Sequence, residues 1–438
     1  MGGHGTGVLR AYNAIYLIRG LTVGIAADSS LYLARSLDLP QHYLVCARGF
    51  GTTVAPALLG IQLGKLMRCG ESQTLVALAL AAKMLCEVAV TRVEINALIF
   101  LAWFGVGVGV AVLDTMSFML ITRVHRKDCA AAFASYDMLY GIGCIIAPFI
   151  VVYDYRRAWD FLAICDFLVF AAVAGKRGIR GKPTDWERKL NGHISGSSKR
   201  DSGASSGAAS PQHGPQGAPH EPSALPALQV EPPARVVKTG MAFTFCVQAT
   251  MTSVSCWSFT YAVKTLQLAP HTAACVPGAF YGACTLARLA MLPLMRSSVS
   301  PAGIMHVGTL LTMTSATVFY LLDSMVAAGA DVAMLVPAFM GCFMVMGAGF
   351  CPHHSLMVAA MQQHGDLSPQ QHGWYGTSTC LGITMGMWLP GYMSLPAMQL
   401  MGTAALLLIL NSQTKDFPRA LKLTKGMTLV PLNDERQY

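Results

Sequence analysis

Apolar runs of ~20 residues, long enough to cross a bilayer as helices, recur along almost the whole chain. They constrain its fold more than any other feature. Inside the hydrocarbon core every backbone N–H and C=O needs a partner within the protein, which leaves helices and closed barrels as spanning forms. A barrel would show alternating segments of about ten residues, and the sequence has none. We therefore predict an all-α integral membrane protein.

The composition favours the same class. The 438 residues are 53% hydrophobic and only 12% charged, whereas a soluble domain carries about 25% charged residues. A net charge of +9 is typical of positively charged cytoplasmic loops and does not indicate a nucleic-acid partner. The thirteen cysteines occur singly, without a CxxC pair, so we expect packing residues rather than disulfides. The first apolar run continues as a long helix, and no cleavable signal peptide is expected.

The apolar runs predict twelve spans in two groups of six. Residues 176–237 are rich in Gly, Ser, Pro, His and charged residues. This composition cannot bury a core and predicts a disordered linker. The linker divides the chain into an N-terminal six-helix half, 1–175, and a C-terminal six-helix half, 238–412, followed by a tail, 413–438. The spans are expected at 9–34, 43–67, 72–92, 95–122, 129–153, 157–175, 239–263, 271–295, 301–322, 330–361, 370–392 and 395–412.

The distribution of basic residues predicts the orientation. Between residues 176 and 238, ten Lys and Arg stand against five Asp and Glu. Basic residues also follow the second and fourth spans and fill the tail, whereas most of the alternate loops have fewer. Because Lys and Arg accumulate on the cytoplasmic side, we expect both termini and the linker in the cytoplasm.

Asp114 is the main candidate for function. It lies near the middle of the apolar, glycine-rich stretch Phe104–Arg123. A charged aspartate at bilayer depth costs roughly 2.5–3.5 kcal/mol, so it is tolerated where it faces a bundle interior or a water-filled cavity. Two interpretations remain open: a coupling site for a proton or a cation, or a structural ion pair with Arg48 or Arg288.

Two further acids lie within predicted spans. Asp28 comes late in the first span, where it either caps the helix near the membrane interface or lines the cavity as a second coupling acid. Asp137 lies in the fifth span, where its carboxylate either binds sugar hydroxyls or pairs with a cation. Both interpretations stay open for each residue.

Polar and aromatic residues of the other spans complete the candidate set. Trp257 and Tyr261 are four residues apart, which places them on one helix face. They form either an aromatic platform for a sugar ring or ordinary packing. Gln248 of the same span offers an amide to the cavity wall. Arg48 and Arg288 are expected in gating or in structural ion pairs.

Motifs of soluble enzymes are missing from the sequence. There is no phosphate-binding loop, no HExxH, no GxSxG and no dinucleotide fingerprint, so we expect neither an ATP-driven pump nor an enzyme. His353 and His354 are the only candidates for a catalytic cluster at the interface, and a zinc site needs more ligands than this pair. We expect no metal and no cofactor. Lys83 and Glu87, four apart, are expected to neutralise each other.

The two halves also repeat each other weakly. Glycines recur in the fourth and tenth spans, and a Tyr-Gly pair recurs in the fifth and eleventh. Such glycines let neighbouring helix backbones approach closely. Weak repetition of two six-span halves predicts a two-halved transporter with its solute near the midplane. The matching residues are Gly105, Gly107 and Gly109 with Gly341, Gly347 and Gly349, and Tyr140-Gly141 with Tyr375-Gly376.

Several segments resemble one branch of the major facilitator superfamily. GVGVGVAVLDT in the fourth span resembles the signature of the fucose-permease branch, which also contains the sodium-dependent glucose transporter-like proteins. DMLYGIGCIIAP in the fifth span is similar to the same branch, as are ARGFGTTVAPALLGIQLGKL and AFYGACTLARL. The resemblance implies twelve helices and alternating access. It also implies proton coupling and sugar binding at Asp28 and Asp114, and sugar contact at Asp137.

The sequence departs from the family pattern at two places. After the second span, Gly64-Lys65 stands where the superfamily has an aspartate followed by Arg or Lys. After the acid of the fourth span, Met116, Ser117 and Phe118 stand where an asparagine often follows. At the first departure, the gating contact that the resemblance implies lacks its usual aspartate.

Together these features predict a secondary active transporter. We expect it to move a small polar solute, a monosaccharide by preference, by alternating access with proton or sodium coupling. The alternatives are a uniporter or exporter of another metabolite, and a non-transporting membrane sensor of a solute. The expected partners are the solute, the coupling ion and the lipid bilayer, with the chain as a monomer. The plasma membrane is the default location, with an organelle membrane as the alternative.

Overall fold

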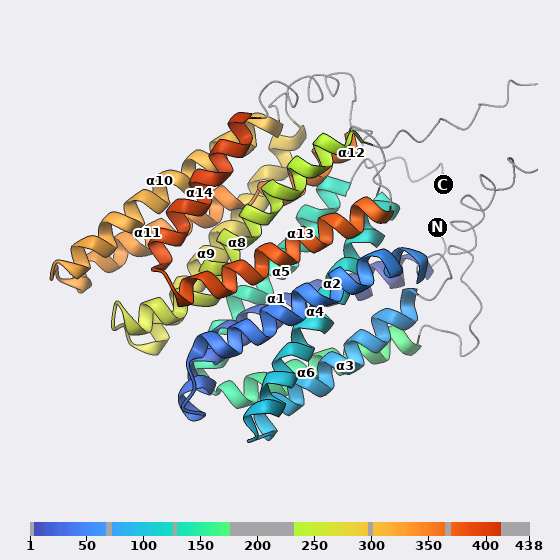
Figure 1. Ribbon diagram of the computed structural model, residues 1–438, viewed down its shortest axis with the longest axis horizontal. Coiled ribbons are helices and arrows are strands. Elements are labelled where there is room, and N and C mark those ends of the chain that lie inside the picture. Colours follow the sequence, from blue (N-terminus) through green and yellow to red (C-terminus); the bar gives the residue numbers. More distant parts are fainter. Residues whose placement is uncertain are drawn as a thin grey trace, which may run out of the picture.

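Long helices make up almost all of the computed structural model, which describes residues 4–66, 72–125, 129–175, 232–296, 301–363 and 369–412. They run side by side in a single bundle (Figure 1). Within these residues there is no β-strand. The helices are α1 (His4–Ser36), α2 (Gln41–Leu66), α3 (Ser72–Arg92), α4 (Asn96–His125), α5 (Cys129–Tyr153), α6 (Tyr155–Gly175), α8 (Ala234–Lys264), α9 (Pro270–Arg296), α10 (Pro301–Ala327), α11 (Val332–Phe350), α12 (His353–Gln363), α13 (Pro369–Trp388), the 3-10 turn η3 (Leu389–Gly391) and α14 (Leu395–Ser412).

The all-α prediction is confirmed, and each predicted span corresponds to helix. One span differs: the segment 330–361 is not continuous, because α11 ends at Phe350 and α12 begins at His353. Pro352 lies between them, and proline lacks the N–H that a continuous helix needs. α8 begins at Ala234, before the predicted end of the linker at 237. The rest of the linker up to residue 231 and the tail 413–438 lie outside the described residues.

Eight stretches of the described residues are long and apolar enough to cross a membrane. They include parts of α1, α3, α4 and α5, and of α9, α10, α11 and α14. The other long helices fall short by composition or because their ends are not described. The number of twelve spans and the orientation of the termini therefore stay predictions.

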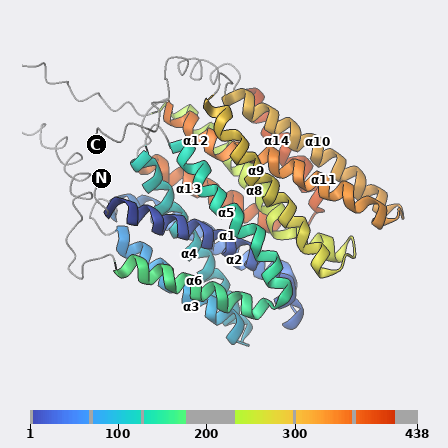
Figure 2. The same ribbon diagram turned by 180° about the vertical axis from the view of Figure 1, so that it is seen from behind.

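The two groups of helices pack by the same scheme. We refer to α1–α6 as the N-terminal half and to α8–α14 as the C-terminal half. In the first, α1 packs on α5, α2 on α4 and α3 on α6; in the second, α8 packs on α13, α9 on α11 and α10 on α14. α3, α4 and α6 lie on one side of the bundle and α10, α11 and α14 on the other, as Figures 1 and 2 show. The weak sequence repeat thus corresponds to a repeat in packing.

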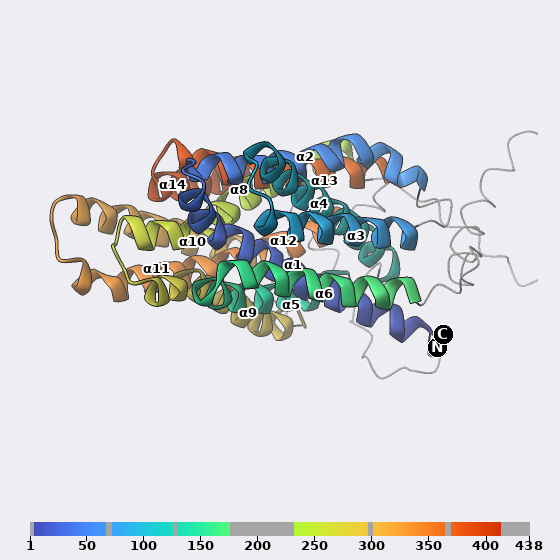
Figure 3. The ribbon, with the colours of Figure 1, turned by 90° about the horizontal axis from the view of Figure 1, so that it is seen from below.

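Most contacts between the described parts of the two halves come from the inner helices. α2 packs on α13, α5 on α9 and α1 on α8. Figure 3 shows α2 beside α13 along one edge of the bundle and α5 beside α9 along the opposite edge. We call the space that α1, α2, α4 and α5 share with α8, α9 and α13 the inter-half region.

Glycine allows the closest of these approaches. A Cβ at Gly107 of α4 would collide with the backbone carbonyl of Arg48 on α2, and a Cβ at Gly51 of α2 would collide with that of Phe104 on α4. A Cβ at Gly347 of α11 would likewise collide with the carbonyl of Phe280 on α9. The two halves therefore use glycine at equivalent helix crossings, as expected from the repeat.

The neighbouring glycines of α4 serve a different contact. Gly105 faces the sulfur of Cys86 and Gly109 faces the side chain of Lys83, both on α3. Of the three, only Gly107 is so close to a neighbouring backbone that a Cβ would collide with it. One face of α4 thus lies against α2 and the other against α3.

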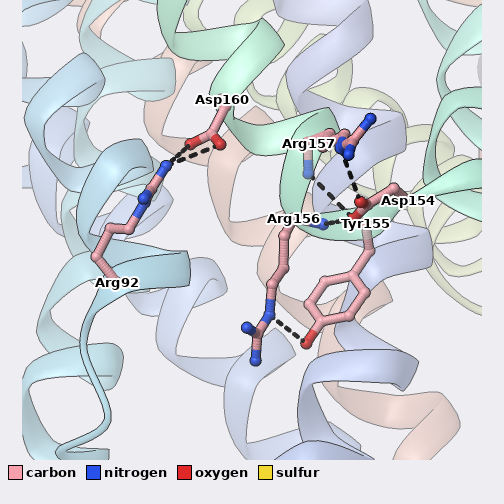
Figure 4. Close-up of polar contacts among 6 residues, drawn as sticks. All are labelled: Arg92, Asp154, Tyr155, Arg156, Arg157 and Asp160. Carbon is pink, nitrogen blue, oxygen red and sulfur yellow. Dashed lines mark hydrogen bonds and ion pairs between the residues drawn. The ribbon is translucent and has the colours of Figure 1, made fainter.

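A buried charged triad joins α3 to α6. The Lys83 ammonium pairs with Glu87 at 2.6 Å and with Asp166 of α6, and all three side chains are at most 1% exposed. The predicted pair of Lys83 and Glu87 is present, and Asp166 adds a second carboxylate. A second link between the helices is exposed: Arg92 donates to both oxygens of Asp160 at 3.0 and 2.9 Å (Figure 4).

Replacing Gly107 by alanine should destabilise the protein by about 1–3 kcal/mol, because the new methyl group meets backbone that cannot move independently. The matched control is Gly341→Ala in α11, where no atom lies within 4 Å of the added Cβ. Thermal unfolding of both purified variants checks the difference. Equal unfolding temperatures would show that α2 and α4 do not depend on this close approach.

Lys83→Met should cost about 3–5 kcal/mol of unfolding free energy, because it leaves two buried carboxylates without a cation. Arg92→Gln removes a cation from the same helix pair, but at the surface, where an ion pair contributes at most about 1 kcal/mol. Denaturation in detergent compares the two variants. A Lys83→Met protein as stable as Arg92→Gln would contradict a structural role for the triad.

Candidate functional site

The inter-half region brings together six charged side chains from four helices of one half and one helix of the other. The sequence predicted five of them as functional; the sixth is Arg19 of α1. Two ion pairs form among them, and two side chains stay without a partner among the described residues. The six are Arg19, Asp28, Arg48, Asp114, Asp137 and Arg288.

Asp114 of α4 pairs with Arg19 of α1. Its partner is therefore neither Arg48 nor Arg288, the two cations considered from the sequence. The two side chains are 20% and 16% exposed. The Arg19 guanidinium also lies over the rings of Tyr140 at 4.9 Å and Tyr16 at 5.6 Å. Both members of the pair belong to the N-terminal half.

Asp137 of α5 pairs with Arg288 of α9, and this contact joins the two halves. Nη2 of Arg288 lies 3.7 Å from Oδ2 of Asp137, and Nη1 donates to the Asp137 backbone carbonyl at 2.9 Å. The side chains are 6% and 13% exposed for Arg288 and Asp137 respectively. A charge pair across the interface resists any motion that separates α5 from α9.

A row of hydroxyl groups lies next to this pair. The Tyr281 hydroxyl of α9 donates to Ser255 Oγ of α8 at 2.7 Å, and the Tyr140 hydroxyl of α5 lies 3.5 Å from that of Tyr281. Tyr140 thus contacts Arg19 with its ring and the C-terminal half with its hydroxyl. The row offers hydrogen-bond donors and acceptors of the kind that recognise a polar solute.

Asp28 of α1 is 1% exposed, and neither carboxylate oxygen has a hydrogen-bond partner among the described residues. An ionised carboxylate in such surroundings would be very costly, since burial removes its water and nothing replaces it. A neutral, protonated side chain fits these surroundings. Asp28 is therefore deep in the bundle and does not cap a helix end.

Arg48 of α2 is the second unpartnered charge. It is 2% exposed, its Nε has no hydrogen-bond partner, and its guanidinium forms no ion pair with the described residues. Val45, one turn before Arg48 on α2, belongs to a small apolar cluster made by both halves. The cluster consists of Ala27, Val45, Cys256 and Met387, with Trp257 and Ile383 packed against it.

Trp257 and Tyr261 of α8 have different neighbours although they are one turn apart. Trp257 Nε1 donates to the Met387 carbonyl of α13 at 3.0 Å, so the ring lies in the apolar cluster of the inter-half region. The Tyr261 hydroxyl donates to Asp323 of α10 at 2.6 Å. Gln248 is half-buried beside Gly382 of α13. Solute contact by these three residues stays a prediction.

The two histidines of α12 differ in surroundings. His353 is buried, stacks on Phe243 at 5.5 Å, and lies with its Nε2 2.8 Å from Thr309 Oγ1. His354 lies with Nδ1 3.3 Å from the Tyr375 hydroxyl and meets Phe133 of the other half edge to face. Within the described residues no three His, Cys, Asp or Glu side chains form a group able to hold a metal ion.

Sequence reasoning missed Arg19 and the tyrosine row. A signal for Arg19 was present, because an arginine in an apolar first span is as costly as Asp114 and calls for a partner of opposite charge. The pairing of Tyr140 with Tyr281 had no signal, since tyrosine is common in membrane helices and the two lie 141 positions apart.

Comparison with solved structures identifies the fold. The structure of the E. coli fucose:proton symporter FucP matches with a TM-score of 0.59, covering 92% of this chain and 98% of that one at 12% sequence identity. A second FucP structure, described as a major facilitator superfamily transporter in the outward conformation, matches with a TM-score of 0.54, 92% and 99% coverage and 13% identity. The chain therefore has the major facilitator fold.

Sequence comparisons identify no relative of this chain. No protein-family model matches the chain, and no curated protein is significantly similar to it.

Asp137→Asn and Arg288→Gln should each destabilise the protein, whereas the double variant should lose less than the sum of the two. The reason is that each single change leaves one buried charge without its partner. We expect a coupling energy on the order of 1 kcal/mol, measured as a double-mutant cycle of unfolding free energies. Additive losses would mean that the two charges do not interact in the folded protein.

Proposed function

We propose that the protein is a secondary active transporter with twelve membrane spans, which moves a small polar solute, a monosaccharide, between its two halves by alternating access. Both termini lie in the cytoplasm. The observation that carries the proposal is the set of three intramembrane acids at the inter-half region of a major facilitator fold. One of the matched structures is that of a fucose:proton symporter, which agrees with a sugar and a proton for this chain. It is not an enzyme.

The solute site is formed by groups of both halves. Asp137 and the tyrosine row of Tyr140 and Tyr281 supply acceptors and donors for sugar hydroxyls, and Trp257 supplies an apolar ring face beside them. Because Asp137 also holds Arg288, solute hydroxyls compete with a contact between the halves. Binding then weakens the pair that keeps α5 against α9.

Asp28 and Asp114 have different roles in coupling. Asp28 is buried without a partner, so it holds a proton while enclosed and releases it when the helices part and water reaches it. Asp114 is paired with Arg19, and that pair is lost when Asp114 takes up a proton. A hard cation such as sodium takes several oxygen ligands, whereas neither carboxylate oxygen of Asp28 has a hydrogen-bond partner among the described residues. The coupling ion is therefore a proton.

A sensor of solutes is the second candidate. The central segment 176–237 is long and polar, as expected of a region that signals to cytoplasmic partners. A sensor would bind solute without carrying it across the membrane. Flux in proteoliposomes separates the two functions.

Asp28→Asn and Asp114→Asn should abolish the accumulation of sugar driven by a pH gradient while the proteins still fold, because neither amide can exchange a proton. The measurement is uptake of labelled L-fucose and D-glucose into proteoliposomes with and without the gradient. Asp28→Asn should still let sugar cross the membrane down the concentration gradient of the sugar, because the amide resembles a protonated carboxyl group.

The matched control is Asp160→Asn, which removes a carboxylate that lies outside the inter-half region and should accumulate sugar like the unchanged protein. Normal gradient-driven accumulation in Asp28→Asn and Asp114→Asn would overturn the coupling role. Sugar binding without any flux in the unchanged protein would establish the sensor instead.

A further inference from the structure

Arg48 is a buried cation that the fold does not neutralise. Its side chain is 2% exposed and makes neither an ion pair nor a hydrogen bond with any described residue. Removing a guanidinium from water is expensive, and proteins normally offset the cost with a carboxylate or carbonyl partner. Such an isolated charge is rare enough in a membrane protein to require an explanation.

The position of Arg48 is fixed by packing. Its own carbonyl lies against Gly107 of α4, so the helix cannot rotate to expose the side chain elsewhere. Val45, one turn before Arg48 on α2, belongs to an apolar cluster with Cys256 of α8 and Met387 of α13. The guanidinium therefore belongs to the inter-half region, next to the apolar cluster on which Trp257 packs.

The charges of the inter-half region do not balance in this arrangement. Arg19 is matched by Asp114 and Arg288 by Asp137. Asp28 is the remaining acid, and its surroundings favour the neutral form because both oxygens are buried without partners. One positive charge, that of Arg48, is then left over.

We propose that Arg48 binds the carboxylate of the solute, and that the solute is a sugar acid or a similar hydroxycarboxylate with one negative charge. This inference rests on the proposed transport function and names its substrate class. A guanidinium matches a carboxylate with two parallel hydrogen bonds. The ring of the same solute lies against Trp257, whose indole N–H donates to the Met387 carbonyl and whose ring is only partly buried.

The number of charges selects a carboxylate over a phosphate. A phosphate monoester carries a charge of about −1.5 to −2 at neutral pH, more than one unpaired arginine neutralises. A carboxylate carries a single charge. With a proton on Asp28 and the solute anion bound at Arg48, the inter-half region has no net charge. This neutrality lowers the free-energy cost of carrying the solute past the bilayer core.

Matched pairs of sugars test the assignment. D-glucuronate and D-glucose, and D-galacturonate and D-galactose, differ only in the oxidation of one carbon. Their binding to the purified full-length protein is measured by thermal shift and by titration, because a ligand that binds the folded state raises the unfolding temperature. We expect each acid to bind at least about tenfold more tightly than its neutral partner, as a charged hydrogen-bonded contact provides.

Variants of Arg48 locate the contact. Arg48→Gln should lose the preference for the acids, with neutral sugars bound as before, and Arg48→Lys should keep part of it because the charge remains. Arg92→Gln is the matched control, since it removes an arginine from the outer surface and should leave the preference unchanged. Asp28→Asn tests whether Asp28 is already neutral, because removing a charged partner of Arg48 would make the acids bind more tightly.

Three results would overturn the proposal. The first is equal or tighter binding of the neutral sugar in both pairs. The second is an acid preference that survives Arg48→Gln. The third is tighter binding of the acids in Asp28→Asn than in the unchanged protein, which would show that an ionised Asp28, and not the solute, neutralises Arg48. Binding does not require flux, so preference for neutral sugars in a protein that transports them would end this inference and leave the proposed function standing.

Discussion

A charge inside the membrane must be matched, and the arrangement of matched and unmatched charges organises this protein. The low dielectric of the bundle makes each isolated charge costly and each close pair strong. The triad of Lys83, Glu87 and Asp166 meets this demand within one half, away from the interface. The inter-half region meets it only in part, since Asp28 and Arg48 have no partner among the described residues.

Close packing of helices is what sets these distances. Gly51 and Gly107 bring α2 against α4, and Gly347 does the same for α9 and α11. Because side chains reach only a few ångströms from the backbone, a wider crossing would move Arg48 away from the region that holds Asp114. The glycines therefore determine which charges can meet, although none of them carries a charge.

The sequence predicted the elements of the fold better than the contacts within the site. The lengths of the apolar runs alone located the helices. The bilayer sets a minimum length for a span and requires the backbone to form its hydrogen bonds within the protein. The break before His353 was missed, since the apolar run continues through Pro352 and hides the lost hydrogen bond. The cost of a buried charge pointed to Asp114, Asp137 and Arg288 as residues of interest.

The partners of those charges could not be predicted in the same way. A buried acid indicates that a cation is near. The sequence alone, however, does not show which of several arginines that cation is. Arg19 meets Asp114 only because α1 lies beside α5 and close to α4. Such a pairing depends on the relative rotation of the helices. It cannot be predicted from the lengths of the apolar runs or from the spacing of residues along the chain. The row from Tyr140 to Ser255 depends on the contact of two halves and is equally hidden.

The distribution of pairs between the halves bears on how the protein can move. Arg19 and Asp114 belong to one half and travel together when the halves rock, so their pair can survive the motion. Asp137 and Arg288 belong to different halves, and their pair is altered whenever α5 and α9 separate. A ligand shifts a conformational equilibrium only by interacting differently with its two states. The groups able to do so here are the pair that crosses the interface and the two side chains that have no partner among the described residues. In the proposed mechanism Asp114 joins them, because its pair with Arg19 is lost when Asp114 takes up a proton.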